Sequence, residues 1–171
     1  NLIGSVRGGY QRKDFNDDTV SSENSPYADV SATFLPSPST RISAGAGYSM
    51  FETEVYPFVN QDRTQVFASL AHDFTARLSF YLTGSYILGH YDSEQVVRPA
   101  DAANPEVSVD GGDETTFLAS TRLTYQLNRS NWIEAGWQYV DFDSKLKYSD
   151  ESKLRQNFVE NRIDLGWKTQ F

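Results

Sequence analysis

The sequence predicts an all-β fold: an antiparallel, up-and-down transmembrane β-barrel with eight strands in this chain. Three observations support this prediction. Apolar and polar residues alternate with period two, and no stretch shows the 3.6-residue period of an amphipathic helix. Short and long connections alternate along the chain, and aromatic residues lie near the ends of the alternating segments. The chain has 171 residues, the size of one domain, so residues 1–171 are expected to form a single one.

The expected strands are long for a soluble protein. Most span about ten residues, whereas the commonest strand length in globular proteins is about 5–6. A tilted strand needs about 9–11 residues to cross a bilayer. No run of about 18 apolar residues is present, so no transmembrane helix is expected. The eight segments are Leu2–Gln11, Tyr27–Leu35, Arg41–Phe51, Gln65–Phe74, Leu78–Tyr91, Thr116–Leu127, Trp132–Phe142 and Phe158–Phe171.

The connections fall into two classes. If the strands are antiparallel, all short turns lie at one end of the barrel, together with both termini, and all long loops lie at the other. Outer-membrane barrels have short periplasmic turns and longer extracellular loops. This predicts a bacterial outer-membrane location with periplasmic termini and extracellular long loops. The short turns are residues 36–40, 75–77 and 128–130, and the long polar loops are residues 12–26, 52–64, 92–115 and 143–157.

Each segment has one apolar face, with rings near its ends, and one small, polar or charged face. In residues 78–88, for example, Leu78, Phe80 and Leu82 alternate with Ser79, Tyr81 and Thr83. The apolar face is expected to meet lipid and the other face the lumen. The charges expected in the lumen are Arg7, Asp29, Arg41, Asp73, Arg122, Glu134, Glu160, Arg162, Asp164 and Lys168.

The role of these charges depends on the width of the barrel. Eight strands that close alone leave an interior only wide enough for side chains. Enclosed charges are costly unless they pair, so they would then form a network that plugs the barrel. In a wider barrel the same side chains would line water and tune ion selectivity.

A soluble alternative is a β-sandwich or a lipocalin-like barrel with the apolar residues turned inward. The strand lengths, the two classes of loop, the aromatic strand ends and the terminal Phe171 argue against it.

The segment NFVENRIDLGWKTQF (Asn157–Phe171) resembles the closing strand of Gram-negative outer-membrane barrels. FTARLSFYLTGSYILGHYDSE (Phe74–Glu94) and YQLNRSNWIEAGWQYVDFDS (Tyr125–Ser144) resemble the C-terminal hairpins of a β-barrel porin family. Members of that family are associated with exopolysaccharide systems or have no assigned function. The resemblance implies that Trp167 and Phe171 form an interfacial signal for the barrel-assembly machinery. It further implies that members of the family are roughly twice this long or more, so the eight strands here are expected either to close alone or to form the C-terminal part of a larger barrel.

Several functional classes are not expected. A net charge of −8 argues against nucleic-acid binding. The absence of cysteine excludes disulfides and thiolate metal sites, and DGGDE (Asp110–Glu114) lacks the ligand spacing of an EF-hand loop. His90 precedes Asp92 by two residues, but alternation turns it outward with Leu88. We therefore expect no enzyme activity, no metal and no cofactor.

The expected function is that of an outer-membrane porin-like or structural barrel, associated with polysaccharide export or with passive solute passage. The alternative is a small plugged barrel that acts as a membrane anchor or binds a protein partner through its acidic loops. Residues 92–115 illustrate this acidity, with seven acidic residues against the single base Arg98. Outer-membrane lipid and lipopolysaccharide are the other expected partners.

Overall fold

The computed structural model describes residues 1–13, 23–92, 95–98, 106–149 and 152–170. These residues form ten strands, and eight of the strands make one antiparallel sheet in the order β1-β2-β3-β4-β5-β8-β9-β10. In this part of the chain there is no helix, hence none long enough to cross a membrane. The strands are β1 (Leu2–Lys13), β2 (Glu23–Ser37), β3 (Thr40–Glu52), β4 (Asn60–Thr75), β5 (Leu78–Tyr91), β6 (Gln95–Arg98), β7 (Val107–Val109), β8 (Gly112–Asn128), β9 (Asn131–Ser144) and β10 (Phe158–Thr169).

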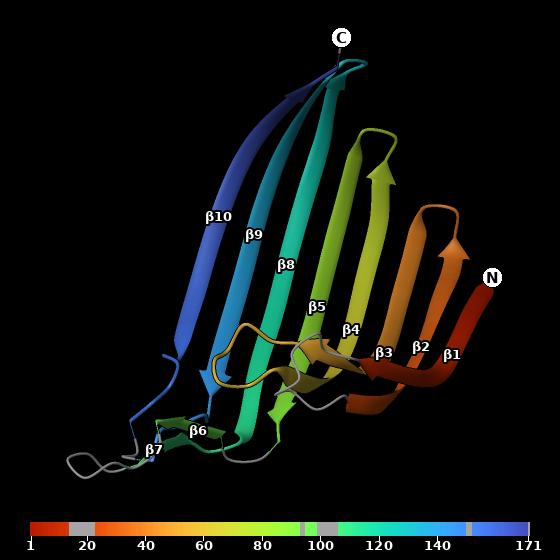
Figure 1. Cartoon of the computed structure of the whole chain (residues 1–171). Helices are drawn as coiled ribbons and strands as arrows, with labels where there is room; N and C mark the ends of the chain where they lie inside the picture. The colour runs from red at the N-terminus through yellow and green to blue at the C-terminus, as the bar shows by residue number, and fades with distance from the viewer. Residues whose placement is uncertain (14–22, 93–94, 99–105, 150–151, 171) are drawn as a thin grey trace.

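The eight-stranded sheet is curved and open, with β1 at one edge and β10 at the other (Figure 1). Among the described residues no strand pairing joins these two edges. The sequence allowed a barrel of eight strands that closes alone, and the structure does not show that closed form. Apolar side chains on the two edge strands are accordingly exposed: Ile163 on β10 is 84% exposed and Val6 on β1 is 79% exposed.

Short turns and long loops are sorted as predicted. The β2–β3, β4–β5 and β8–β9 hairpins turn at the same end of the sheet, where both termini also lie (Figure 1). Local side chains hold these turns. Thr75 Oγ1 accepts from the backbone N–H groups of Arg77 and Leu78 at 3.2 and 3.1 Å, and Asn128 Oδ1 accepts from the N–H of Ser130 at 2.9 Å. Such side-chain bonds replace the backbone bonds that a turn cannot make.

The strand register assigns every side chain to one of two faces. Residues directly opposite one another in paired strands point to the same side of a sheet, and successive residues alternate. One row across the whole sheet is Ile3, Thr33, Ser43, Ser69, Thr83, Ser120, Gln138 and Arg162, all polar except Ile3 on the edge strand. A row on the opposite side is Leu2, Phe34, Ile42, Leu70, Leu82, Thr121, Trp137 and Ile163. We call the side of the first row the polar face and the other side the apolar face.

The best-buried apolar residues lie in the loops and at the loop ends of the strands. Val109 and Leu146 are fully buried, and Phe58 and the strand residue Tyr91 pack with them. Backbone bonds join the segments, for instance Ser149 N–H to the Ser108 carbonyl at 2.9 Å and Leu154 N–H to the Leu146 carbonyl at 3.1 Å. We call this unit the loop cap; it comprises the described residues of 53–59, 95–98, 106–111 and 145–157.

The loop cap corrects the prediction that residues 92–115 are one polar loop. That segment contains the β6–β7 hairpin, and β8 begins at Gly112. β2, β4 and β8 all extend further toward the loops than predicted. Residues 92–115 were predicted to be one polar loop because acidic residues dominate their composition. The hairpin forms because the apolar residues among them pair and pack locally, namely Val96, Val97, Val107 and Val109.

Replacing Leu146 by alanine is expected to loosen the loop cap and leave the sheet intact. Removing a buried leucine side chain costs about 2–5 kcal/mol. Hydrogen exchange of the Ser149 and Leu154 amides should therefore accelerate, while amides in the β8–β9 ladder keep their protection. Leu127→Ala is the control, because Leu127 is 38% exposed near a turn. Unchanged protection of the cap amides in L146A would contradict a packed cap.

Candidate functional site

All ten charges predicted for the lumen lie on the polar face. Their positions follow from the register alone: Arg7 opposes Asp29, and Arg122 opposes Gly136, which opposes Asp164. The ten are Arg7 on β1, Asp29 on β2, Arg41 on β3, Asp73 on β4, Arg122 on β8, Glu134 on β9, and Glu160, Arg162, Asp164 and Lys168 on β10.

The structure brings few of these ten charges together. Arg7 Nε donates to Asp29 Oδ1 at 3.1 Å, which is the single ion pair among the ten in the described part of the chain. Asp73 accepts a hydrogen bond from Ser79 Oγ at 2.6 Å. Within the part of the chain that the structure describes, Arg41, Arg122, Arg162 and Lys168 make no ion pair.

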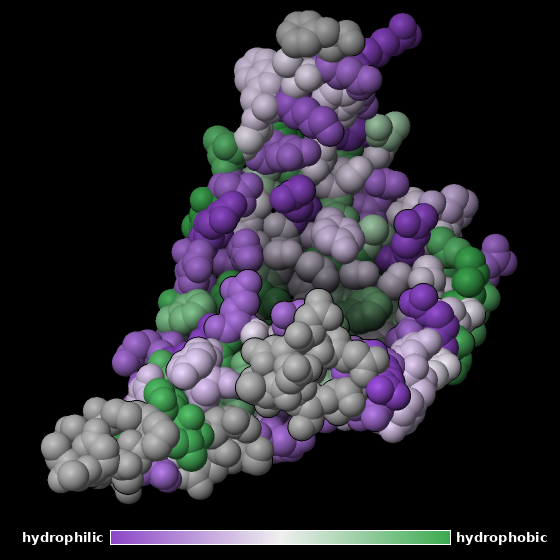
Figure 2. Space-filling model, in the orientation of Figure 1, coloured by the Kyte–Doolittle hydropathy of each residue, from purple (hydrophilic) through white to green (hydrophobic). Residues whose placement is uncertain are grey.

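The polar face is hollow. Figure 2 shows a concave surface with hydrophilic side chains on both flanks of a pale floor and hydrophobic residues mostly at its margins. One depression, of about 380 Å³, lies over β5, β8 and β9 and includes Thr83, Arg122, Gln138 and Asp164. A second, of about 390 Å³, lies over β2, β3 and β4. Each depression is lined by both charged and hydroxyl groups, so both can hold water and polar solutes.

Glycines on the polar face allow large neighbours to lie flat. A Cβ atom added to Gly45 would be 2.7 Å from the Phe67 ring, and one added to Gly136 would be 2.6 Å from the Asp164 carboxylate. Both distances are shorter than real Cβ contacts, so the neighbouring side chain occupies the space that any other residue would fill. Tyr27 lies over Gly9 in the same way. These side chains therefore run along the sheet instead of standing upright from it.

The polar face also carries groups that the sequence prediction did not assign to it. Arg63 and Gln65 share β4 with Phe67, and alternation with Asp73 was the signal that could have found them. Eight aromatic residues lie on this face: Tyr27, Phe51, Phe67, Tyr81, Tyr91, Trp132, Phe142 and Phe158.

At the loop end, the cap closes onto the polar face. The buried Glu114 carboxylate accepts from Tyr91 Oη at 2.8 Å and from Arg155 Nη1 at 2.9 Å. The Arg155 guanidinium also stacks on the Phe142 ring, 4.6 Å from its centroid. Arg155 thus ties the last long loop to β8 and β9, and we call Arg155, Glu114 and Phe142 together the Arg155 latch.

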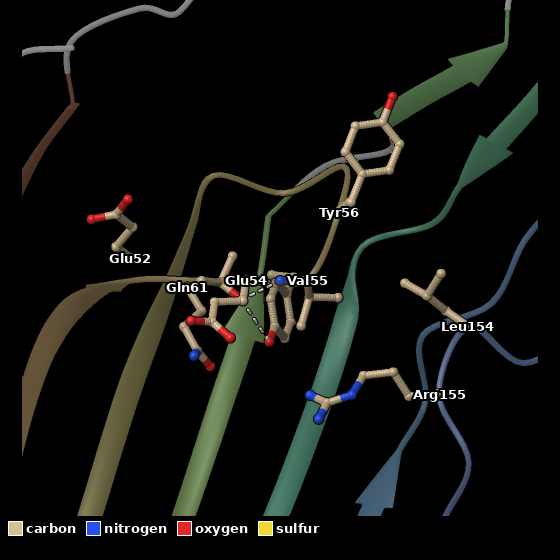
Figure 3. Close-up of a pocket in the computed structure, with 9 residues that line it drawn as sticks. Glu52, Glu54, Val55, Tyr56, Gln61, Leu154 and Arg155 are labelled. Carbon is tan, nitrogen blue, oxygen red and sulfur yellow. Dashed lines mark hydrogen bonds between the residues drawn. The ribbon is translucent and has the colours of Figure 1, made fainter.

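The latch borders an open pocket of about 500 Å³ at the mouth of the polar face. Leu154 and Arg155 approach this pocket from the last long loop, whereas Val55 and Gln61 lie across it and Tyr56 points away (Figure 3). The pocket has three carboxylate or guanidinium groups in its lining, namely Glu52, Glu54 and Arg155. None of these was predicted, because they meet only through the folding of two separate loops.

Both histidines lie on the apolar face, as alternation predicted for His90. His72 Nδ1 is 2.8 Å from Thr40 Oγ1, and its ring packs edge-on against Phe74. His90 has Asp113 Oδ1 2.7 Å from Nδ1 and Asp92 Oδ1 3.2 Å from Nε2. Both ring nitrogens of His90 are thus engaged by carboxylates, which leaves neither placed to act as a base toward water.

The predicted assembly signal is described only in part. Trp167 is 71% exposed on the apolar face and donates from Nε1 to Asn131 Oδ1 at 3.1 Å. Phe171 lies outside the described residues. As for metals, no group of three or more His, Asp or Glu side chains in the described ranges is arranged to hold an ion.

Breaking the Arg155 latch is expected to open the last long loop. Losing a hydrogen bond to a charged group costs about 1.5–3 kcal/mol, so trypsin should cleave at Lys145, Lys147 or Lys153 about tenfold faster or more in Arg155→Met. Arg129→Met is the matched control, because Arg129 is exposed in the β8–β9 turn. Equal cleavage rates at the loop lysines in both variants would show that the latch does not hold the loop.

Comparison with known proteins agrees with this architecture. The chain matches the family described as "Putative beta-barrel porin 2" over residues 1–171. Neither the comparison with curated proteins nor the one with solved structures gave a match. The family match spans the same eight-stranded sheet whose two faces differ so sharply, and it confirms the resemblance read from the hairpins. The chain belongs to this β-barrel porin family.

Proposed function

We propose that this chain forms a wall of a water-filled, porin-like barrel in the bacterial outer membrane, through which small solutes pass passively. The observation that carries the proposal is the separation of the two faces. The polar face holds the ten predicted charges and Arg63 and lines two hollows, whereas the apolar face holds rows such as Leu2, Phe34, Ile42 and Leu70. In a membrane, strands whose side chains face water on one side and lipid on the other are found in the wall of a barrel, where the backbone hydrogen bonds are all made between strands.

A barrel wider than eight strands fits this polar face better than a plugged one. An eight-stranded interior is just wide enough to be filled by side chains. Here eight rings, the ten predicted charges and Arg63 share the polar face, and only Arg7 and Asp29 pair among these charges in the described residues. In lipid, β1 and β10 must also complete their backbone hydrogen bonds. We propose that further strands do this, from the same protein or from a second copy.

The remaining expectations fit this proposal as follows. The short turns would face the periplasm and the loop cap the cell exterior, with the apolar face in contact with lipid and lipopolysaccharide. Trp167 and Phe171 would serve recognition by the barrel-assembly machinery. We propose a non-enzymatic role, which is supported by the position of His90 on the apolar face between two carboxylates. Export of a polysaccharide would use the same barrel for a larger molecule. This role is supported by the family resemblance alone.

A second candidate function is binding of a protein partner by the loops. The loop cap favours it, because a buried core of Phe58, Tyr91, Val109 and Leu146 gives these loops a fixed shape. A rigid loop surface can recognise a partner at a lower entropic cost than a flexible one. Partner binding by the loops is compatible with a pore. It would require a pore only if the bound partner delivered a solute for passage.

The pore is tested by conductance of the purified protein in planar bilayers. We expect steady open channels whose ion preference depends on Arg122, because that guanidinium lines the hollow over β5, β8 and β9 without an ion-pair partner in the described residues. Arg122→Gln should shift the reversal potential toward cation preference and Arg122→Glu should shift it further. Absence of channels in the wild-type protein would favour the plugged, partner-binding barrel instead.

A further inference from the structure

The depression over β2, β3 and β4 has the form of a trough with an open floor. Gly47 lies in the floor, and a Cβ atom added there would meet nothing closer than 3.7 Å. Phe67 closes one end, lying flat over Gly45, and Phe51 is at the other end. The volume of about 390 Å³ is within the range of about 300–1,000 Å³ that is usual for small-molecule sites.

The trough carries one unmatched positive charge. The Arg7 guanidinium is neutralised by Asp29 at 3.1 Å. Arg63 makes no ion pair within the described residues, and its guanidinium stacks on the Phe51 ring, 5.0 Å from the centroid. The only neighbouring side chain with a carboxylate in the lining is the already paired Asp29. An anion in the trough would therefore meet a net charge of +1.

Arg63 also has a donor that lacks an acceptor. Its Nε atom is buried and has no hydrogen-bond partner among the described residues, and it is the single such side-chain atom in that part of the chain. A buried donor left without an acceptor costs about 1–3 kcal/mol, so native proteins rarely leave one. This observation is independent of the charge count, and it leaves Arg63, in the lining of the trough, as the described side chain with an unsatisfied buried donor.

We propose that this trough is a binding site for a small organic anion, namely a carboxylate carried by an aromatic ring. The carboxylate would accept from the planar guanidinium of Arg63, which suits two-oxygen acceptors. The rings of Phe51 and Phe67 have no polar atom and match an apolar ring better than a polyhydroxylated one. The inference deepens the proposed function by naming a solute class, and it rests on that function insofar as the polar face must meet water.

The test uses 4-fluorobenzoate as the probe and fluorine NMR line broadening as the measurement, with the whole protein in nanodiscs. We expect concentration-dependent broadening with the wild-type protein. Arg63→Gln removes the charge, and Gly47→Val fills the floor; each should weaken binding about tenfold, as expected for the loss of roughly 1.4 kcal/mol. Valine fits at position 47 because its Cβ meets only ordinary contacts, so the strand should fold normally.

Two controls make the result specific. Arg77→Gln removes the same charge from the β4–β5 turn and should bind the probe as the wild type does. The alcohol 4-fluorobenzyl alcohol has the ring without the charge and should bind no better to the wild type than to R63Q. Absence of wild-type broadening, or equal broadening in wild type, R63Q and G47V, would overturn the proposal and leave Arg63 Nε to an ordered water. Channel conductance without the probe reports the pore separately, so either idea can fail alone.

Discussion

The strand register is the constraint on which the rest of this structure depends. Because side chains alternate at every residue, a slip of one position would exchange the two faces of a strand. In β8, for example, such a slip would move Arg122 to the apolar face and Phe117 to the polar one. The register is continuous through all seven pairings of the sheet, and the irregularities are confined to hairpin ends, such as Asp73/Thr75 and Gln126/Asn128.

The same constraint explains the glycines of the polar face and the place of the loop cap. Where a bulky group lies on the polar face, a cross-strand glycine gives it room to lie flat, as Gly45 does for Phe67 and Gly136 for Asp164. The wall stays thin and the hollows stay open. At the loop end, buried contacts form on the polar side of the sheet among Tyr91, Glu114 and Arg155. The two hollows and the loop-end pocket therefore lie on the polar face or at its mouth.

Alternation alone was sufficient to predict the sheet, the sorting of turns and loops, and the face of all ten charges, because these depend on local period and on antiparallel order. It could not predict whether the sheet closes. Closure depends on backbone hydrogen bonds between β1 and β10, and the alternation of side chains within each strand does not specify that pairing. It also missed the Arg155 latch and the trough at Arg63. Arg155 and Glu114 are 41 residues apart and meet through loop folding. That Arg63 Nε is buried without a partner among the described residues is visible only in three dimensions.

The central claim is that alternate residues of one strand meet lipid and water, and the cysteine-free sequence allows a direct measurement. Single cysteines at positions 117 to 122 of β8 would carry a nitroxide label in liposomes, and its collision rates with oxygen and with a water-soluble nickel complex would be compared. Labels replacing Phe117, Ala119 and Thr121 should collide mainly with oxygen, and those replacing Leu118, Ser120 and Arg122 mainly with nickel. A profile without period two, or with the two sets reversed, would contradict this account.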